Sequence, residues 1–135
     1  MSEININYLA VLVCGASSMV IGFFWYGPLF GKAWMEEVGK TEEDLKENFN
    51  PGKTYSLAYI SAVITALTLA YFLDLTGAQT IMESLRVSIA AWLGFAAALF
   101  YLNSLFEGRT VRYVTINIGY HLVNLVVYGL ILVSW

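Results

Sequence analysis

Four long apolar runs constrain the fold of this chain more than any other feature. They cover residues at about 6–26, 51–75, 81–106 and 111–134, and each has the ~20 residues that a helix needs to cross a hydrocarbon core of about 30 Å. Of the 135 residues, 59% are hydrophobic and 13% are charged, which is too apolar for a soluble domain. The sequence therefore predicts an all-α integral membrane protein with four transmembrane helices in a single membrane domain, residues 1–135.

Residues with strong capping and turn preferences stand at the ends of these runs. The last two helices are joined by a very short turn, so consecutive helices are expected to pair as two antiparallel hairpins. In chain order, the signals are Asn5 or Asn7 as the first N-cap, Gly27-Pro28 as the first stop, Asn50-Pro51 as the second start, Gly77 as its stop, Thr80 with Glu83 as a capping box for the third helix, and Gly108 as the turn before the fourth.

The connector at residues 27–50 is polar and mixes lysines with acidic residues. Phe30, Trp34 and Val38 recur at every fourth position, which is the spacing of a short helix that lies on the membrane interface. Thr41 and Asp44 resemble a capping box, so the charged half is expected either to form a second short turn or to remain a solvated connector. The residues expected at the interface are Trp25, Tyr26, Pro28, Phe30 and Trp34.

Lysine and arginine are distributed unevenly between the two ends of the helices. The first connection holds four lysines and the last turn holds Arg109 and Arg112, which makes six, against Arg86 alone at the opposite ends. The positive-inside rule then predicts a cytoplasmic connector and non-cytoplasmic N- and C-termini. Arg86 is expected to snorkel to the interface or to pair with Glu83 or Asp74.

Small and polar residues mark the faces on which membrane helices pack, because close approach and interhelical hydrogen bonds hold such helices together. Each of the first three helices has one such stripe, and we expect all three to be packing faces. The stripes are Asn7, Cys14, Ser18, Gly22 and Trp25 in the first helix, Thr54, Ala58, Ser61, Thr65 and Thr68 in the second, and Ala90, Gly94 and Ala97, flanked by Ala91 and Ala98, in the third.

The fourth helix carries a polar line that runs its whole length. Its members are Thr110, Tyr113, Asn117, His121, Asn124 and Tyr128, at steps of three and four residues. His121 falls near the bilayer midplane, about 15 Å deep, at a depth similar to Ser18. Two interpretations stay open: an interhelical hydrogen-bonded cluster, for example His121 to Ser18, or a polar pathway in which His121 is the one group that titrates near neutral pH.

Several classes of function lack the residues they require. The net charge of −3 comes without a basic cluster, so no nucleic-acid partner is predicted. No Asp or Glu lies inside an apolar run, which disfavours a carboxylate-based antiporter. One histidine and one cysteine, Cys14, are too few for a metal site. Ser17, Ser18 and His121 have no acidic partner for a hydrolytic triad, so we expect no catalytic residues, no metal, no cofactor and no enzyme activity.

Three segments of the chain and its terminal Trp135 carry closely spaced aromatic, glycine and polar residues. The segments are Gly22-x-x-Trp25-Tyr26-x-Pro28-x-Phe30-Gly31-x-x-Trp34, Leu105-Phe106-Glu107-Gly108-Arg109 and Ile116-Asn117-x-Gly119-Tyr120-x-Leu122. Together they resemble an uncharacterised family of small, mostly bacterial membrane proteins, which is classed as a domain of unknown function. The resemblance covers nearly the whole chain, and it implies a four-helix protein of the bacterial inner membrane with no assigned activity.

Three functions compete on these grounds. The first is transport or conduction of a small solute or ion along Asn117, His121, Asn124, Tyr128 and Ser18, by a homo-oligomer, because four short helices enclose little space alone. The second is a structural or accessory role in which the polar line is internal glue and the connector binds a partner. The third, which the sequence favours least, is an enzyme that acts on a lipid or quinone at the cytoplasmic interface. The lipid bilayer is a partner in all three.

Overall fold

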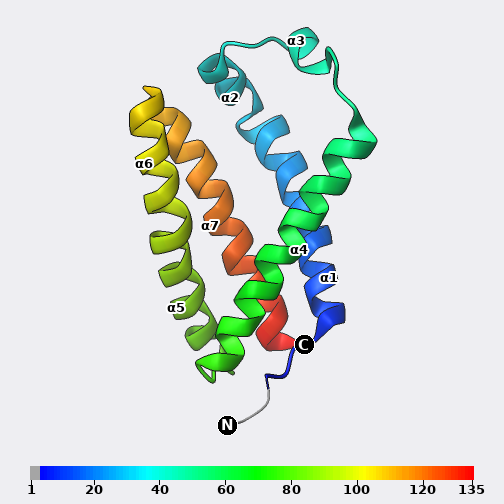
Figure 1. Ribbon diagram of the computed structural model, residues 1–135, viewed down its shortest axis with the longest axis vertical. Helices are drawn as coiled ribbons and strands as arrows, with labels where there is room; N and C mark the ends of the chain where they lie inside the picture. The colour runs from blue at the N-terminus through cyan, green and yellow to red at the C-terminus, as the bar shows by residue number, and fades with distance from the viewer. Residues whose placement is uncertain (1–3) are drawn as a thin grey trace.

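The computed structural model describes residues 4–135, all of whose regular structure is helical. Four stretches are long and apolar enough to cross a membrane, Tyr8–Leu29, Pro51–Leu75, Ile81–Glu107 and Val111–Ser134, so the all-α, four-span prediction is confirmed. Figure 1 shows these elements in chain order: α1 (Tyr8–Phe24), the π-helical turn η1 (Trp25–Leu29), α2 (Gly31–Val38), α3 (Glu42–Lys46), α4 (Pro51–Leu75), α5 (Ile81–Trp92), the π-helical turn η2 (Leu93–Ala97), α6 (Ala98–Glu107) and α7 (Val111–Ser134).

The helices begin where the capping residues of the sequence predict. Their side chains accept a backbone N–H in the first turn, which satisfies a donor that the helix itself leaves unpaired. The predicted caps are Asn7 for α1, Thr41 for α3, Asn50 for α4 and Thr80 for α5. Thr110 caps α7 in the same way, although it was not predicted as a cap. The capping box at Thr80 is incomplete. The Thr80 hydroxyl accepts the backbone N–H of Glu83, but the Glu83 carboxylate accepts the backbone N–H of Gln79 and not that of Thr80.

The predicted stop at Gly27-Pro28 is wrong. Pro28 lies inside η1, and the chain continues directly into α2. Proline has no N–H to donate to the carbonyl four residues before it, so an α-helical ladder cannot pass this point unchanged. The ladder shifts to the wider π spacing instead, and Phe30 N–H donates to the Trp25 carbonyl oxygen at 2.8 Å.

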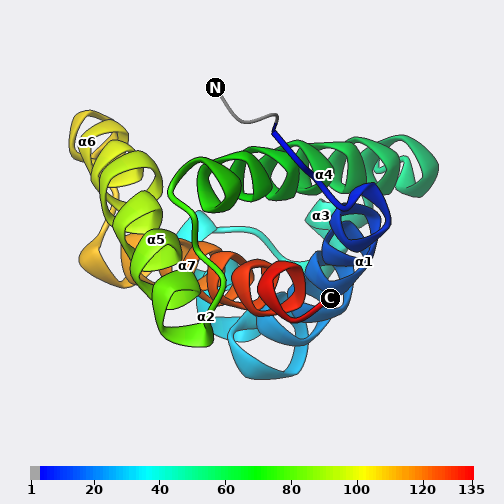
Figure 2. The same ribbon diagram turned by 90° about the horizontal axis from the view of Figure 1, so that it is seen from below.

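The four spans form two antiparallel hairpins that meet along one line. One hairpin is α1 with α4, the other is α5–η2–α6 with α7, and α1 packs against α7 between them. Seen from below, in Figure 2, α4 runs along the upper side of the view, α5 and α6 lie on the left, α7 lies in the middle and α1 on the right. In Figure 1, α4 runs obliquely: it comes close to α5 near the turn that joins them and diverges from α6 towards the connector. The two hairpins are therefore joined where α1 packs against α7 and splayed apart where α4 diverges from α6.

The third span packs on α7 through a different face from the one the sequence suggested. Ser84 and Ser88 are fully buried against Gly129, where a Cβ atom would come within 2.5 Å of Ser88 Oγ. Ala90 and Ala98 are exposed, and the side of Gly94 faces open space, so that part of the predicted stripe is not a packing face within one chain. The buried line continues from Ser88 to Ala97 only because η2 adds a residue to one turn and rotates α6 relative to α5.

The second span also departs from expectation. Ser61, Thr65 and Thr68 are exposed instead of packed, and the Thr65 and Thr68 hydroxyls donate to carbonyl oxygens of their own helix. A threonine in a membrane helix can satisfy its donor this way without a neighbour. In the first span, by contrast, Cys14 and Ser18 are buried as predicted.

Candidate functional site

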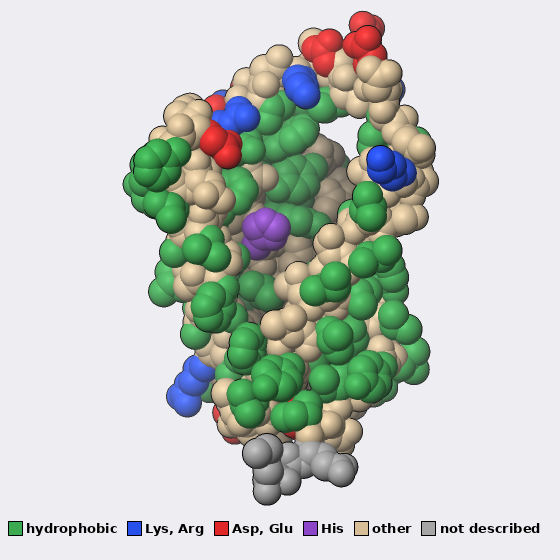
Figure 3. Space-filling model, in the orientation of Figure 1, with side chains coloured by type: hydrophobic (Ala, Val, Ile, Leu, Met, Phe, Trp, Pro, Cys, Tyr) green, Lys and Arg blue, Asp and Glu red, His purple; other side chains and the backbone are tan. Residues whose placement is uncertain are grey.

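A pocket of about 700 Å³ occupies the angle between the two hairpins. We call it the central pocket. One wall is α4, from Ala58 to Phe72, which corresponds to about 20 Å along that helix. The opposite wall is α5, η2 and α6, and the back is α7 with Ser18 of α1. Figure 3 shows this face hollowed between the two walls, with the histidine side chain, His121, at the edge of the hollow.

The polar line on α7 divides into two sets. Asn117 belongs to the first, which is bonded and closed: its Oδ1 accepts from the Tyr26 hydroxyl at 2.6 Å and its Nδ2 donates to the Tyr113 carbonyl oxygen at 2.9 Å. Asn117 is buried and does not line the central pocket. This residue therefore connects α7 to the first span, and no open path along the line includes it in this conformation.

Ser18 belongs to the same bonded set, although its partner is not the predicted one. Its hydroxyl pairs with the Tyr120 hydroxyl at 3.2 Å, and Tyr120 also donates to the Ser18 carbonyl oxygen at 3.2 Å. The expected hydrogen bond from His121 to Ser18 is wrong, because Tyr120, one position earlier on α7, reaches α1 in its place. Tyr128 is buried too, and its carbonyl oxygen accepts the Cys14 thiol at 3.8 Å.

His121 and Asn124 form the second set, which faces the central pocket. Within residues 4–135 the His121 ring packs near the rings of Phe100 and Tyr120, at centroid distances of 6.5 and 5.5 Å, and forms no hydrogen bond. Asn124 is 4% exposed; its Nδ2 donates to the Tyr120 carbonyl oxygen, while its Oδ1 has no partner. A buried acceptor without a partner is costly in an apolar surrounding, so Asn124 is suited to a molecule that brings a donor.

An apolar layer closes the central pocket towards the chain termini. It consists of Leu69, Ala70, Leu73, Leu125 and Tyr128, all buried in the main hydrophobic cluster. Beyond it lies a second, smaller hollow of about 210 Å³, which Asn5, Asn7, Asp74 and Gln79 line together with Ala70 and Leu73. The layer therefore separates the central pocket from a second hollow nearer the chain termini.

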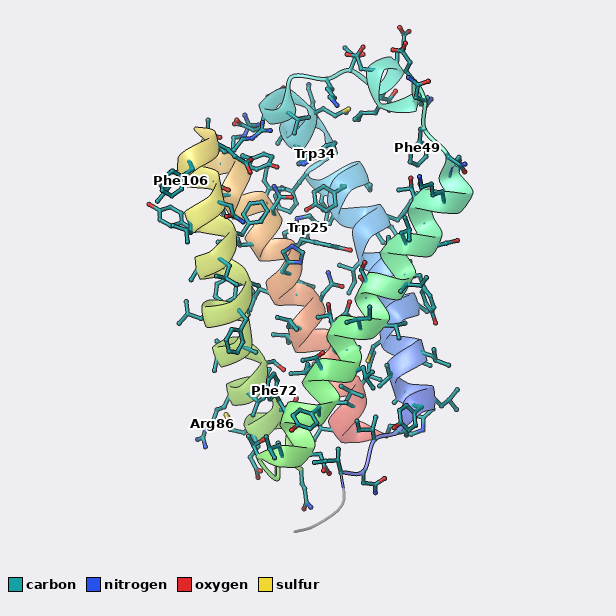
Figure 4. The ribbon with its side chains drawn as sticks, viewed as in Figure 1. Trp25, Trp34, Phe49, Phe72, Arg86 and Phe106 are labelled. Carbon is teal, nitrogen blue, oxygen red and sulfur yellow. The ribbon has the colours of Figure 1, made fainter. Side chains whose placement is uncertain are left out.

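Two of the predicted interfacial residues, Trp25 and Tyr26, donate hydrogen bonds to α7, whereas Pro28 and Phe30 are exposed; the interfacial position of the set stays a prediction. Trp25 Nε1 donates to the Ile116 carbonyl oxygen at 2.9 Å, and its ring lies against Gly119, where a Cβ would come within 3.1 Å. Gly22 faces Tyr120 in the same way, because a Cβ at position 22 would come within 2.9 Å of the Tyr120 hydroxyl oxygen. Figure 4 shows Trp25 and Trp34 directed towards the interior of the bundle, and Tyr26 packs edge-on against Trp34 at 5.7 Å.

These contacts join two of the three segments that suggested a family, the one that begins at Gly22 and the one that begins at Ile116. Residues 9–133 match the family model described as DUF1761, protein of unknown function. The chain belongs to the DUF1761 family. No curated protein and no solved structure matches it. The family assignment thus confirms the resemblance and supplies a multi-pass membrane protein without an assigned activity.

In this DUF1761 protein the connector is attached to the fourth span. Glu37 of α2 accepts from the Thr110 hydroxyl at 2.7 Å, and Arg112 lies 3.3 Å from the Glu36 carboxylate and 3.6 Å from that of Glu37. The acidic side chains of α2 thereby meet the N-terminus of α7, where a helix favours negative charge. The short helix that the sequence predicts after the first span is therefore present as α2. The sequence did not predict that polar contacts would hold it to α7.

The second predicted turn of the connector is present as α3, and its capping box is complete. The backbone N–H of Thr41 donates to the Asp44 carboxylate at 2.9 Å, which lowers the pKa of Asp44, and the Thr41 hydroxyl and the charge of Lys40 act in the same direction. At the opposite end, Asp74 accepts the backbone N–H of Asn5. Within the described residues Arg86 forms no ion pair with Asp74 or Glu83, and Figure 4 shows it directed away from the bundle.

Sequence reasoning missed several residues that line the central pocket. Asn103 and Tyr120 line it, and so do Thr65 and Thr68, which the sequence predicts as packing residues. Thr65 and Thr68 are visible in the sequence as a polar stripe, but a stripe does not say whether a neighbouring helix covers it. Asn103 had a signal, because an amide within the third apolar run is expensive in lipid unless it meets a partner or a cavity.

Proposed function

We propose that this protein moves a small solute across the membrane and that the central pocket is its solute site. The observation that carries the proposal is the pocket itself, because its volume of about 700 Å³ lies within the range of small-molecule sites. His121 and Asn124 stand on its inner wall without a full set of partners. Such groups at membrane depth are a default indication of a binding site or pathway.

The apolar layer supports transport by alternating access. It separates the central pocket from the smaller hollow nearer the chain termini, and in this proposal the central pocket communicates with one side of the membrane at a time. A change in the packing of Leu69, Leu73 and Leu125 would switch the pocket to the other side. The solute is neutral in this proposal, because the described lining of the pocket contains no Asp, Glu, Lys or Arg to balance an ion.

The proposal includes a location and an assembly. The membrane is the bacterial inner membrane, with the connector in the cytoplasm and both termini on the other side, in line with the six-to-one distribution of Lys and Arg. The pocket forms within one chain and does not require a second copy. The homo-oligomer expected from the sequence therefore stays a prediction, and the mass of the protein in lipid nanodiscs would give the number of subunits. We propose no catalytic step, because His121 lacks a hydrogen-bonded partner within residues 4–135 that could orient it.

A second candidate function is an accessory role through the connector. The observation that favours it is the bonded set on α7, in which Asn117 and Ser18 serve as glue between helices. The exposed helix α3, with acidic residues in its first turn and Lys46 in its last, would then meet a cytosolic partner. In that role the central pocket would have no access to water.

Thiol labelling distinguishes the two functions. In a Cys14→Ala background, single cysteines replace His121, which faces the pocket, and Asn117, which lies one turn away on the same helix and is buried. Inverted and right-side-out vesicles are treated with a small, membrane-impermeant maleimide. Lys40→Cys in the connector and Gln79→Cys in the opposite turn, both exposed, report which side the reagent reaches.

We expect His121→Cys to react only from the side that labels Lys40→Cys, and Asn117→Cys to resist from both sides. Inverted vesicles should be the ones that label Lys40→Cys, which tests the proposed orientation. Protection of His121→Cys from both sides, in protein with an unchanged circular dichroism spectrum, would refute the solute site and leave the accessory role.

A further inference from the structure

We infer that the ligand of the central pocket is a neutral, lipid-soluble molecule with a hydroxyl group that donates a hydrogen bond, and that it enters from the bilayer between α4 and α5–α6. The inference rests on the proposed function and names its substrate class. Its basis is the inventory of donors and acceptors on the pocket wall, the absence of charge in the described lining, and the shape of the opening.

Beside Asn124, the wall of the pocket offers acceptors, because the neighbouring donors are already used. The hydroxyl hydrogens of Thr65 and Thr68 are used on carbonyl oxygens of α4, so these side chains offer lone pairs alone. The Tyr120 hydroxyl donates to the Ser18 carbonyl oxygen. Asn124 donates to the Tyr120 carbonyl oxygen and keeps Oδ1 unpaired. A ligand that satisfies Asn124 Oδ1 must therefore bring a donor of its own. The side chains of Ser61, Asn103 and His121, which form no hydrogen bond within residues 4–135, keep donors elsewhere on the wall.

The same wall excludes a charged donor. An ammonium group at this depth would need a carboxylate beside it, and the described lining contains none. A neutral hydroxyl meets the requirement without a counter-charge. The rings of Phe100 and Tyr120 beside His121 add flat apolar surface next to the polar wall, which suits a ring or another compact group that carries the hydroxyl.

The opening between the hairpins gives the apolar part of such a molecule a place in the lipid. Its lips are apolar and exposed: Ile64 on α4 is 58% exposed, and Phe95 and Leu99 on the other wall are 70% and 52% exposed. Phe72 and Phe95 stack at 6.5 Å across the gap and form its lower edge; Figure 4 shows Phe72 on the α4 side. A purely polar solute would have to cross this rim, whereas a lipid-soluble molecule can leave its tail in the bilayer.

A matched pair of ligands tests the donor. The protein with Cys14→Ala and Thr65→Cys is placed in lipid nanodiscs that contain either 4-octylphenol or its methyl ether, 4-octylanisole, at the same mole fraction. The two probes share ring and tail, but the ether has no hydrogen to donate. The readout is the rate at which an impermeant maleimide labels the cysteine, which falls when the pocket is occupied.

We expect the phenol to protect the cysteine at about tenfold lower mole fraction than the ether, because one hydrogen bond to an otherwise unpaired buried acceptor is worth about a factor of ten. The preference should disappear when Asn124→Leu is added. It should persist with Thr115→Val, a control on the same helix whose hydroxyl bonds within α7 and whose side chain is exposed outside the pocket. Thermal unfolding of both variants checks that they are folded.

Equal protection by the two probes would overturn the inference, and so would a preference that Asn124→Leu leaves intact. If Asn124→Leu does not fold, the comparison of phenol with ether in the parent protein still decides the need for a donor. Rapid labelling of Thr65→Cys with no protection by either probe would reject this ligand class while the solute site stands. No labelling of Thr65→Cys or His121→Cys without any probe would instead refute the proposed function.

Discussion

The hydrogen bond between Tyr26 and Asn117 offers a quantitative test of how the first span is held to the fourth. At 2.6 Å it is the shortest side-chain hydrogen bond between two spans in residues 4–135, and Asn117 is 8% exposed. Tyr26→Phe removes the donor with little change in ring packing against Trp34. It also leaves Asn117 Oδ1 buried without a partner.

The magnitude has two contributions. Interhelical hydrogen bonds in membrane proteins contribute about 0.6 kcal/mol on average and up to about 1.7, and a buried acceptor left unpaired costs about 1–3 kcal/mol. We therefore expect Tyr26→Phe to lower the free energy of unfolding by about 1–2 kcal/mol. In an Asn117→Leu background the same change should cost about 0 to 0.5 kcal/mol, because no acceptor remains.

The assay is reversible unfolding in mixed micelles with increasing sodium dodecyl sulfate, monitored by far-ultraviolet circular dichroism. Tyr101→Phe is the matched control, since Tyr101 is 50% exposed and its hydroxyl forms no hydrogen bond within the described residues. The reasoning fails if Tyr26→Phe and Tyr101→Phe are equally stable, or if Tyr26→Phe costs as much without Asn117 as with it.

Three further predictions concern other parts of the chain. Gly129→Ala forces a Cβ into the buried serine pair of α5 and should cost about 1–3 kcal/mol in the same unfolding assay, whereas Gly94→Ala, which faces open space, should be neutral or slightly stabilising; equal effects would contradict the assigned packing face. Arg112→Gln removes the ion pairs to α2 and should raise the rate of amide hydrogen exchange in α2, as high salt should in the parent protein. The unfolding free energy should change by less than about 1 kcal/mol because the ion pairs are exposed, and an unchanged exchange rate would show that they do not hold α2. The folded pKa of Asp44 lies below its unfolded value, so its support of α3 is present above the unfolded pKa and is lost as the pH falls through the folded one. Thr41→Ala removes the hydroxyl and keeps the backbone N–H, so a carboxyl titration by NMR should find the Asp44 pKa raised towards its ordinary value but still below it; no rise would contradict the part assigned to the hydroxyl.

The elements that the sequence predicted well are those whose causes are local. The apolar runs define four spans because lipid leaves a backbone no other way to satisfy its polar groups. The caps at Asn7, Asn50 and Thr80 depend on side chains that bond within one turn. Neither inference needs to know which helices are neighbours, and both agree with the structure.

The faces of the helices were harder to predict, because they depend on neighbours and on the register of each turn. The stripe at Gly94 fails since η2 adds one residue to a turn, and no residue type in that segment announces a π-helical turn. Thr65 and Thr68 match the pattern of packing residues because a small polar stripe is typical of a contact, yet α4 diverges from α6 and leaves them open. The position of an oblique helix is a property of the whole bundle.

The polar line of α7 was predicted correctly as a feature, while its division into two sets was not. Asn117 and His121 lie four residues apart, so the sequence places both on one side of the helix. In the structure a tyrosine from the first span reaches Asn117, whereas His121 lies where the hairpins have begun to separate. The difference comes from the partner helices, which differ along α7, and not from the line itself.

Glue and pocket are therefore two consequences of one arrangement. The contact between α1 and α7 is held by Trp25 on the Ile116 carbonyl oxygen, Tyr26 on Asn117, and Ser18 on Tyr120. Both hairpins are joined along this line, so we expect the contacts along it to set the angle between α4 and α6 and, with that angle, the width of the central pocket. On the proposed function, a substitution on this line such as Tyr26→Phe would act on the pocket without touching it, whereas Asn124→Leu would change what the pocket binds. The two interpretations that the sequence left open would then describe two parts of the same bundle, the contact that joins the hairpins and the space between them.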